Sequence, residues 1–230
     1  MKYGWKPIEY KFILLGDSSV GKSSIFQRLS GKPFSYSQLS TTGIDKVLVH
    51  FDDTKISENA CQNFDVTLFD TAGQERFRSI TRDYFRNSQG IVLIYSIVNK
   101  ESFEHIQSWL DSIKTTLSDW KKSEYMIMLL GNKSDLAEEE PESRMIQVEE
   151  AERFCNEQGI YWGGECSAKT FEIEKIKGIF EKFLKQIYSK LGDYNNNKNP
   201  KKETKKLVKS DKNPKKAECC LFKKKETSDK

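Results

Sequence analysis

Cysteine and histidine patterns that bind metal ions or staple small domains are missing from this sequence. Five cysteines and two histidines occur among 230 residues, without a Cys-x-x-Cys pair or a cysteine–histidine cluster. This pattern argues against a zinc site and against a disulfide framework. Cys155 and Cys166 stand in apolar stretches, and we expect both to be buried core thiols.

Long apolar runs are missing as well. The N-terminal stretch MKYGWKPIEYKFILLG has no run long enough for a signal peptide. The most apolar segment, IVLIYSIV at 91–98, is too short to span a bilayer. We therefore expect a protein that is cytosolic when it is synthesised.

Charge is distributed unevenly along the chain. Residues 191–230 hold thirteen lysines and six acidic residues, a net charge of +7, so the overall +4 leaves −3 for residues 1–190. The basic segment has too few apolar residues to fold, and we expect a disordered tail after one acidic domain. Such a tail meets anionic lipid or nucleic acid, or serves only as a solubilising linker. Nucleic acid is the weakest of these hypotheses, because the tail has no arginine and only Tyr194 and Phe222 for stacking.

Apolar runs alternate with amphipathic segments, which predicts an α/β fold with a mostly parallel central sheet and helices on both faces. Continuous apolar runs at 90–98 and 125–131 are typical of strands buried in a parallel sheet. Ligands of such sheets bind beyond the carboxyl ends of the strands. The other predicted elements are a strand at 11–16, a hairpin of 45–51 with 64–70, and helices at 22–30, 102–117, 147–159 and 173–188.

The segment GDSSVGKS at 16–23 lies between the first strand and the first helix and fits the pattern G-x-x-x-x-G-K-[ST]. Its backbone N–H groups would wrap a phosphate, Lys22 would reach the β- and γ-phosphate oxygens, and the Ser23 hydroxyl would bind Mg²⁺. A Gly/Ser turn that only opens a helix is the plainer alternative, which the strand–loop–helix context disfavours. The predicted phosphate-binding residues are Gly16, Ser18, Ser19, Val20, Gly21, Lys22, Ser23 and Ser24.

The segment GNKSDL at 131–136 follows a buried strand and predicts recognition of a base. Asp135 would accept hydrogen bonds from the ring N–H and the exocyclic amine of guanine. Adenine offers no such pair of donors, so it would leave the carboxylate unsatisfied. Asn132 would brace the loop, and the aliphatic stem of Lys133 would cover one face of the base.

The segment ECSAK at 165–169 supplies a second loop for the same base. Ser167 belongs to this loop, the backbone N–H of Ala168 would meet the guanine carbonyl, and the stem of Lys169 would lie on the ring. Each short motif alone is more often a surface turn. Their order, and their positions after strands, favour guanine over adenine.

The segment DTAGQERF at 70–77 begins where a strand ends. Asp70 is placed to hold Mg²⁺ through a water, the Gly73 N–H to bond the γ-phosphate, and Gln74 to orient the attacking water. Upstream, Thr41 would be a second hydroxyl ligand of Mg²⁺ while that phosphate is present, although an ordinary loop threonine is the alternative. Loss of the phosphate would release both loops, which makes an order-to-disorder switch. The predicted catalytic residues are Lys22, Gly73 and Gln74.

These motifs, in this order over residues 8–190, resemble the Ras superfamily of small GTPases, and more narrowly its Rab branch, which directs vesicle traffic. The resemblance implies a P-loop small-GTPase domain over residues 1–190 that hydrolyses GTP slowly as a monomeric, Mg²⁺-dependent GDP/GTP switch. It also implies exchange factors, GTPase-activating proteins and effectors as partners. Thr41 lies nineteen residues after Lys22, as in the family, which makes Phe34 the aromatic residue at the edge of guanine.

Some residues depart from the Rab pattern. Lys46 stands where Rab proteins usually have an apolar aromatic residue, and Phe69 where they usually have tryptophan. With Tyr84 these positions match the hydrophobic triad that effectors bind, so one charged member changes the expected effector surface. The stretches 52–63 and 136–147 are longer than their family counterparts, and we expect both to be surface loops.

The chain ends in AECCLFKKKETSDK, with Cys219 and Cys220 followed by ten further residues. Rab proteins typically end in two prenylated cysteines with few residues after them, so prenylation, palmitoylation and no lipid all remain open. The lysines would add affinity for an anionic leaflet. We expect peripheral attachment to the cytosolic face of an intracellular membrane. A GTP-binding scaffold or switch without a stable membrane role is the alternative.

Overall fold

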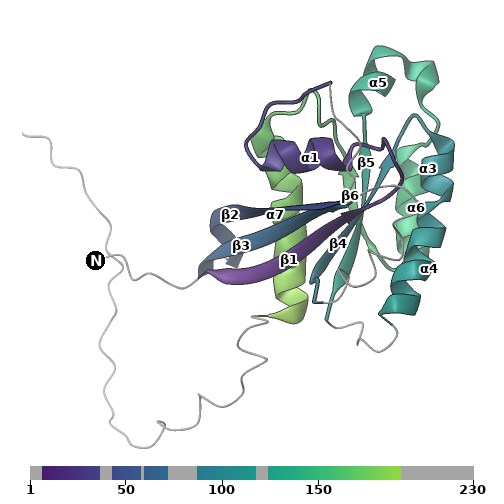
Figure 1. Cartoon of the computed structure of the whole chain (residues 1–230). Helices are drawn as coiled ribbons and strands as arrows, with labels where there is room; N and C mark the ends of the chain where they lie inside the picture. The colour runs from purple at the N-terminus through teal and green to yellow at the C-terminus, as the bar shows by residue number, and fades with distance from the viewer. Residues whose placement is uncertain (1–6, 37–42, 58–59, 72–86, 118–123, 193–230) are drawn as a thin grey trace, which may run out of the picture. The chain divides into compact units, whose positions relative to one another are not determined.

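The computed structural model describes residues 7–36, 43–57, 60–71, 87–117 and 124–192 (Figure 1). Its centre is a six-stranded sheet in the order β2-β3-β1-β4-β5-β6. Only the β2–β3 pair of this sheet is antiparallel, which confirms the predicted mostly parallel α/β fold. The strands are β1 (Ile8–Leu15), β2 (Ile44–Ser57), β3 (Ala60–Thr71), β4 (Gly90–Ser96), β5 (Met126–Asn132) and β6 (Tyr161–Glu165). The helices are α1 (Lys22–Leu29), α3 (Lys100–Glu104), α4 (Ile106–Thr116), α5 (Ser134–Glu139), the 3₁₀ turn η2 (Pro141–Ser143), α6 (Val148–Gln158) and α7 (Ile173–Leu191).

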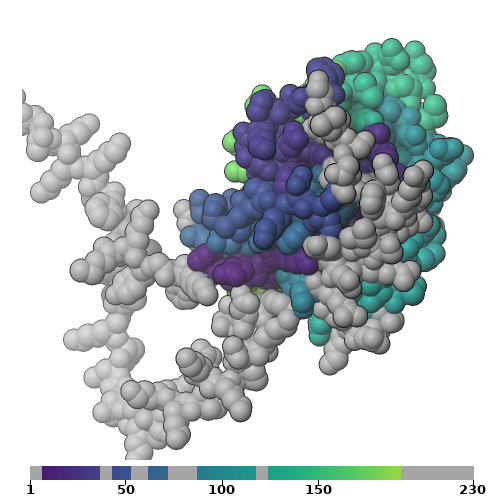
Figure 2. Space-filling view, in the orientation of Figure 1, coloured from purple at the N-terminus to yellow at the C-terminus, as the bar shows by residue number. Residues whose placement is uncertain are grey.

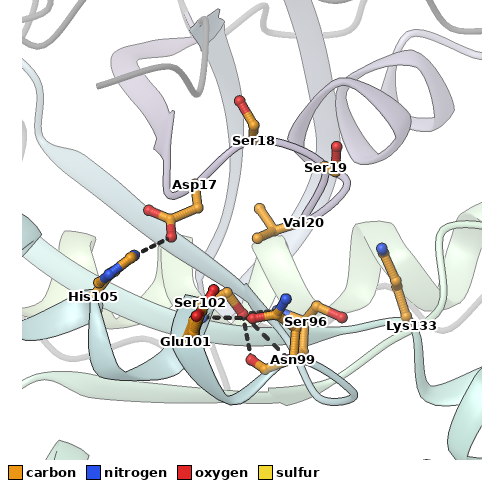
Figure 3. A pocket seen from close by; sticks show the side chains of 10 residues that line it. All are labelled: Asp17, Ser18, Ser19, Val20, Ser96, Asn99, Glu101, Ser102, His105 and Lys133. Atoms are coloured by element: carbon orange, nitrogen blue, oxygen red, sulfur yellow. Dashed lines mark hydrogen bonds and ion pairs between the residues drawn. The ribbon is translucent and has the colours of Figure 1, made fainter. Parts of the chain in front are cut away.

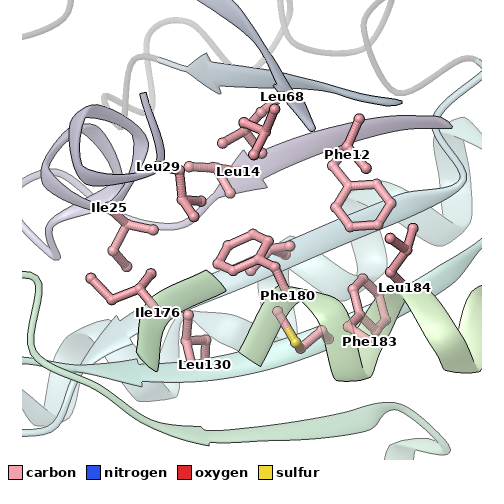
Figure 4. Packing of buried hydrophobic residues seen from close by; sticks show 14 of the residues in the cluster. Phe12, Leu14, Ile25, Leu29, Leu68, Leu130, Ile176, Phe180, Phe183 and Leu184 are labelled. Atoms are coloured by element: carbon pink, nitrogen blue, oxygen red, sulfur yellow. The ribbon is translucent and has the colours of Figure 1, made fainter. Parts of the chain in front are cut away.

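Two apolar clusters, one on each face of the sheet, form the core. On one face, α1 and α7 pack against the strands, and the ring centre of Phe12 of β1 lies 5.4 Å from that of Phe183 of α7 (Figure 4). On the other face, α4 and α6 cover the sheet, with Trp109 and Cys155 among the buried side chains. Helices therefore lie on both faces, as the alternation of strands and helices predicts.

Cys155 and Cys166 are both buried, as predicted. Burial disfavours the thiolate and raises the pKa of each thiol to about 12. Both cysteines therefore act as small apolar residues of the core.

The prediction of a surface loop over 52–63 is wrong for most of that stretch. Strand β2 runs on to Ser57 and β3 begins at Ala60, so the added residues lengthen the hairpin. The pairing continues through Thr54 with Gln62, after a register shift that follows Phe51. The polar composition was misleading because cross-strand hydrogen bonds satisfy the backbone of an edge hairpin whatever side chains it carries.

Three further elements differ from expectation. The predicted loop at 136–147 contains the end of α5 and the turn η2, which starts at Pro141, a residue suited to the first helical position. The helix predicted over 102–117 is two helices that meet at His105. Strand β6 was not predicted, because Gly163 and Gly164 weaken the strand pattern. Gly163 has a packing role, since a Cβ there would lie 2.7 Å from the sulfur of Met128.

Candidate functional site

The predicted phosphate loop leaves the carboxyl end of β1 and returns into α1, beside the ends of β4 and β5 (Figure 1). Two of its glycines are required by the geometry. Gly16 has φ 136°, and a Cβ there would lie 2.1 Å from the carbonyl oxygen of Ile94. Gly21 has φ 100°, and a Cβ there would lie 2.1 Å from Nδ2 of Asn132. Larger residues would push the loop away from the sheet edge.

Helix α1 begins at Lys22 with Gly21 as its N-cap. No side chain caps this end, and the first turn holds no acidic residue. The first N–H groups of a helix have no partner within the helix, and the helix dipole favours negative charge there. This end of α1 is therefore suited to an anion such as phosphate.

Lys22 is a buried cation at this helix end, with 4% of its surface exposed. Its Nζ donates a hydrogen bond to the backbone oxygen of Asp17 at 2.6 Å. Burial lowers the pKa of Lys22 to about 8, and the carboxylates of Asp70 and Asp17 only partly offset this effect. A phosphate group would supply the missing negative charge.

Asp70 lies on β3 in register with Leu14 of β1, and only 1% of its surface is exposed. Mg²⁺ keeps several waters and takes one or two protein oxygens together with phosphate oxygens. Ser23 and Asp70 offer such oxygens, so the residues fit Mg²⁺. Within the described part of the chain, no group of three or more His, Cys, Asp or Glu side chains could hold a metal by itself.

Asn132, at the end of β5, joins the phosphate loop to the second base loop. Its Nδ2 donates to the backbone oxygen of Val20 at 2.8 Å, and its Oδ1 accepts from the backbone N–H of Ala168 at 3.1 Å. Asn132 is 2% exposed, so both bonds are shielded from water. The amide of Ala168, predicted to meet guanine, thus already has one acceptor.

Asp135 stands at the start of α5 and is 5% exposed. The Ser167 hydroxyl donates to its Oδ1 at 2.6 Å and accepts hydrogen bonds from the backbone N–H groups of Lys169 and Thr170. The Nζ of Lys169 lies 3.8 Å from Oδ2 of Asp135. The structure therefore brings the two predicted base loops together around one carboxylate.

Lys133 and Phe34 flank this region. Lys133 has φ 71°, and burial lowers the pKa of its ammonium while Asp135 opposes that effect. Phe34 packs against the core face that carries α1, and its ring meets Tyr36 edge-on at 5.1 Å between centroids. The Nζ of Lys169 lies 5.9 Å from the centre of the Tyr36 ring, so this segment borders the base loops.

A cavity of about 530 Å³, lined mostly by polar and charged residues, lies beside the phosphate loop (Figure 3). The loop forms one wall, and the end of β4 with the start of α3 forms another. Its lining residues are Asp17, Ser18, Ser19, Val20, Ser96, Asn99, Glu101, Ser102, His105 and Lys133.

Of the predicted effector surface, Lys46 and Phe69 face each other across the β2–β3 pair. Lys46 is exposed, while Phe69 is partly buried with the Lys11 ammonium 4.8 Å from the centre of its ring. The space-filling view shows that β2, drawn in blue, forms part of the molecular surface (Figure 2). The predicted residues that lie outside the described part of the chain are Thr41, Gly73, Gln74, Tyr84, Cys219 and Cys220.

Several residues of this region have no signal in the sequence. Arg144 forms two parallel hydrogen bonds to Glu165, at 2.7 and 2.8 Å, just before the ECSAK cysteine. His105 and Trp109 bind the carboxylate of Asp17. These pairs are 21 to 92 residues apart, so only the folded chain identifies them.

Comparison with known proteins agrees with this geometry. The model of the Ras family matches residues 11–189. The chain is 33% identical over 201 residues to GTP-binding protein YPT52 of Saccharomyces cerevisiae, an alignment that covers 79% of this chain and 82% of that protein. It is 36% identical over 191 residues to Ras-related protein Rab-1 of Theileria parva, covering 82% and 78%. Ras-related protein Rab-44 of Homo sapiens is 40% identical over 159 residues, covering 69% of this chain and 14% of that longer protein.

The chain belongs to the Ras family. Its relatives narrow this to a Rab-like small GTPase, an enzyme that binds GTP and GDP, hydrolyses GTP and serves vesicle traffic. The resemblance inferred from the motifs is confirmed, and it is favoured over a scaffold without such a role. In the part of the chain that the structure describes, no helix is long and apolar enough to cross a membrane.

Proposed function

We propose that the carboxyl edge of the sheet is a Mg²⁺-dependent switch site for GDP and GTP, with the residue roles that follow. The observation that carries this proposal is the Asn132 side chain. It binds the phosphate loop through Val20 and the base loop through Ala168. One buried residue thus couples the loop for the phosphates to the loop for the base.

At the phosphate end, the first N–H groups of α1 and the Lys22 ammonium compensate the negative charge. Ser23, and Asp70 through a water, would hold Mg²⁺, which would neutralise negative charge on the phosphates when bound. Gln74 orients the attacking water. The Lys22 ammonium is already in position, because it donates a hydrogen bond to the backbone oxygen of Asp17.

Two more contacts make the phosphate end a switch. Gly73 would bind the γ-phosphate, and Thr41 would bind Mg²⁺ only while that phosphate is present. Hydrolysis of GTP therefore releases both segments. Their roles, and that of Gln74, rest on spacing in the sequence and on the family, because these residues lie outside the described part of the chain.

At the base end, Asp135 reads guanine. Ser167 holds one of its oxygens, and a carboxylate has lone pairs left for the ring N–H and the exocyclic amine of the base. The Ala168 amide donates to the guanine carbonyl as well as to Asn132, a three-centre bond. Phe34 and the stems of Lys133 and Lys169 enclose the ring.

Asp135→Asn tests this assignment without emptying the site. The amide keeps an oxygen for Ser167 but replaces the second acceptor by a donor. Xanthine carries a carbonyl where guanine carries its amine, so the variant should lose affinity for GDP by at least about tenfold and gain affinity for xanthosine diphosphate. Asp65→Asn, at the other end of the sheet, is the matched control. Unchanged GDP affinity in Asp135→Asn would refute the role of this carboxylate.

We also propose that the basic segment after α7 brings the protein to an anionic membrane surface, with a lipid on Cys219 or Cys220. Thirteen lysines and the cysteine pair support this proposal. Intact-mass analysis of the native protein would show the lipid. The native protein should float with phosphatidylserine vesicles, and the Cys219/Cys220→Ser variant should not. Unmodified thiols in the native protein would contradict the lipid anchor.

The partners we propose are exchange factors, GTPase-activating proteins and effectors. Effectors would meet the surface of Lys46, Phe69 and Tyr84. The exposed ammonium of Lys46 calls for an acidic group on the effector beside its apolar contacts.

A further inference from the structure

We propose that His105 is a positioning residue for the phosphate loop. Together with Trp109 it holds the carboxylate of Asp17, so that the bound nucleotide leaves more slowly than it would without this contact. The inference rests on the proposed nucleotide site and concerns how long the nucleotide stays bound.

Both oxygens of the Asp17 carboxylate are held from one face of a helix. Trp109 Nε1 donates to Oδ1 at 2.9 Å. His105 Nδ1 lies 2.5 Å from Oδ2 (Figure 3). Because a carboxylate accepts, Nδ1 is the ring nitrogen that carries the hydrogen. The two donors are one helical turn apart, joined by the bond from the Trp109 N–H to the His105 carbonyl at 3.1 Å.

The helix that carries these donors is firmly mounted. Trp109 is 2% exposed, and its neighbours Ile106, Leu110 and Ile113 are fully buried against the sheet. Rigid core packing gives the two donors a fixed position. Asp17 is therefore tied to the core of the domain and not to another loop.

Asp17 is also the point at which the phosphate loop meets its lysine. The residue before it, Gly16, passes so close to β4 that a Cβ would lie 2.1 Å from the oxygen of Ile94. The carbonyl of Asp17 accepts the bond from Lys22 Nζ at 2.6 Å. A shift of Asp17 would therefore move both the loop backbone and the ammonium that is to face the phosphates.

Solvent reaches this contact. The His105 side chain is 54% exposed, and the residue lies in the wall of the cavity beside the phosphate loop. The charged groups that face it are Asp17 from the loop, Glu101 one turn earlier on α3, and Lys133 across the cavity. Lys22 is linked to this contact by its hydrogen bond to the backbone oxygen of Asp17. Of these, Asp17 makes the direct contact.

A hydrogen bond to a carboxylate is charge-assisted and is stronger than one between two neutral groups. Loss of the His105 donor should therefore loosen the hold on Asp17 and speed up the release of GDP by about two- to fivefold, the range expected for a half-exposed pair.

The test is the dissociation rate of fluorescent GDP from the full-length, Mg²⁺-loaded protein. His105→Ala removes the donor, whereas His105→Gln keeps a donor and should rescue the rate. The matched control is His50→Ala, because the chain has only two histidines. His50 forms a similar pair with Asp65, 2.7 Å apart, in register with the start of β1, whereas the phosphate loop follows the end of that strand.

We expect His105→Ala to release GDP about two- to fivefold faster than the wild type, and His105→Gln and His50→Ala to release it at the wild-type rate. A wild-type rate in His105→Ala, or a rate in His105→Gln as fast as that of His105→Ala, would overturn the proposal. Failure of the wild type to bind GDP stoichiometrically would overturn the proposed nucleotide site itself.

Discussion

Lys22 shows how one buried side chain ties pH to nucleotide binding. Burial lowers the pKa of its ammonium from 10.5 to about 8. The folded, nucleotide-free chain therefore disfavours the charged form, and its free energy of unfolding should rise between about pH 8 and 10.5, where only the unfolded chain keeps the proton. Bound phosphates favour the charged ammonium and raise its pKa again.

Binding of GDP near pH 8 should therefore take up a proton onto Lys22. Titration calorimetry in two buffers with different ionisation enthalpies measures this uptake. GDP affinity should fall as the pH rises above about 8. In Lys22→Met the proton uptake should vanish and the affinity should drop at least about tenfold. An uptake that persists in the variant would assign the proton to another group.

Gly21 allows the backbone of the phosphate loop to lie close to the side chain of Asn132. With φ 100° and no room beside Nδ2 of Asn132, Gly21→Ala should lower the free energy of unfolding by about 1–3 kcal/mol and abolish GDP binding. Urea denaturation measures the first effect. Gly178→Ala is the matched control, because a Cβ there meets nothing within 4 Å and Gly178 lies inside α7. It should stabilise the protein by about 0.5–1 kcal/mol.

At the scale of elements, the Arg144–Glu165 pair joins the segment after η2 to the end of β6. The pair is bidentate, and its side chains are 22% and 15% exposed. The hydrogen bonds to Glu165 raise the pKa of the Arg144 guanidinium. Because β6 leads directly into Ser167 and Ala168, this pair sets where the second base loop starts.

Arg144→Ala should therefore lower the free energy of unfolding by about 1–3 kcal/mol and speed up GDP release. Lys185→Ala provides the comparison, because it removes a surface pair with Glu181 on α7 and should cost less than about 0.5 kcal/mol. Stopped-flow release of fluorescent GDP reports the second effect. Equal release rates in the two variants would show that the base loop does not depend on Arg144.

Most elements could be predicted because burial shapes their sequence. Strand β4 is buried along its whole length and reads as an unbroken apolar run. Helix α7 buries a single face and shows helical spacing. Strand β6 was missed because a partly exposed strand at the edge of the sheet needs no apolar pattern. The outer part of the β2–β3 hairpin was missed because backbone pairing extends it whatever side chains it carries.

At the scale of the whole molecule, the nucleotide site was predictable where a local motif carries it. The phosphate loop and both base loops are short segments that follow strands, so the fold brings them to one edge. The contacts of Asp17 with His105 and Trp109, 88 and 92 residues away, have no local pattern. Tertiary packing alone creates them.

Competition between nucleotides tests the central claim, that this edge of the sheet selects guanine through Asp135 and binds phosphates through Lys22. The measurement is displacement of fluorescent GDP from the full-length protein in Mg²⁺ by unlabelled GDP, GTP or ATP. GDP and GTP should displace it stoichiometrically, while ATP in hundredfold excess should not. Displacement by ATP at concentrations similar to those of GTP would contradict the account.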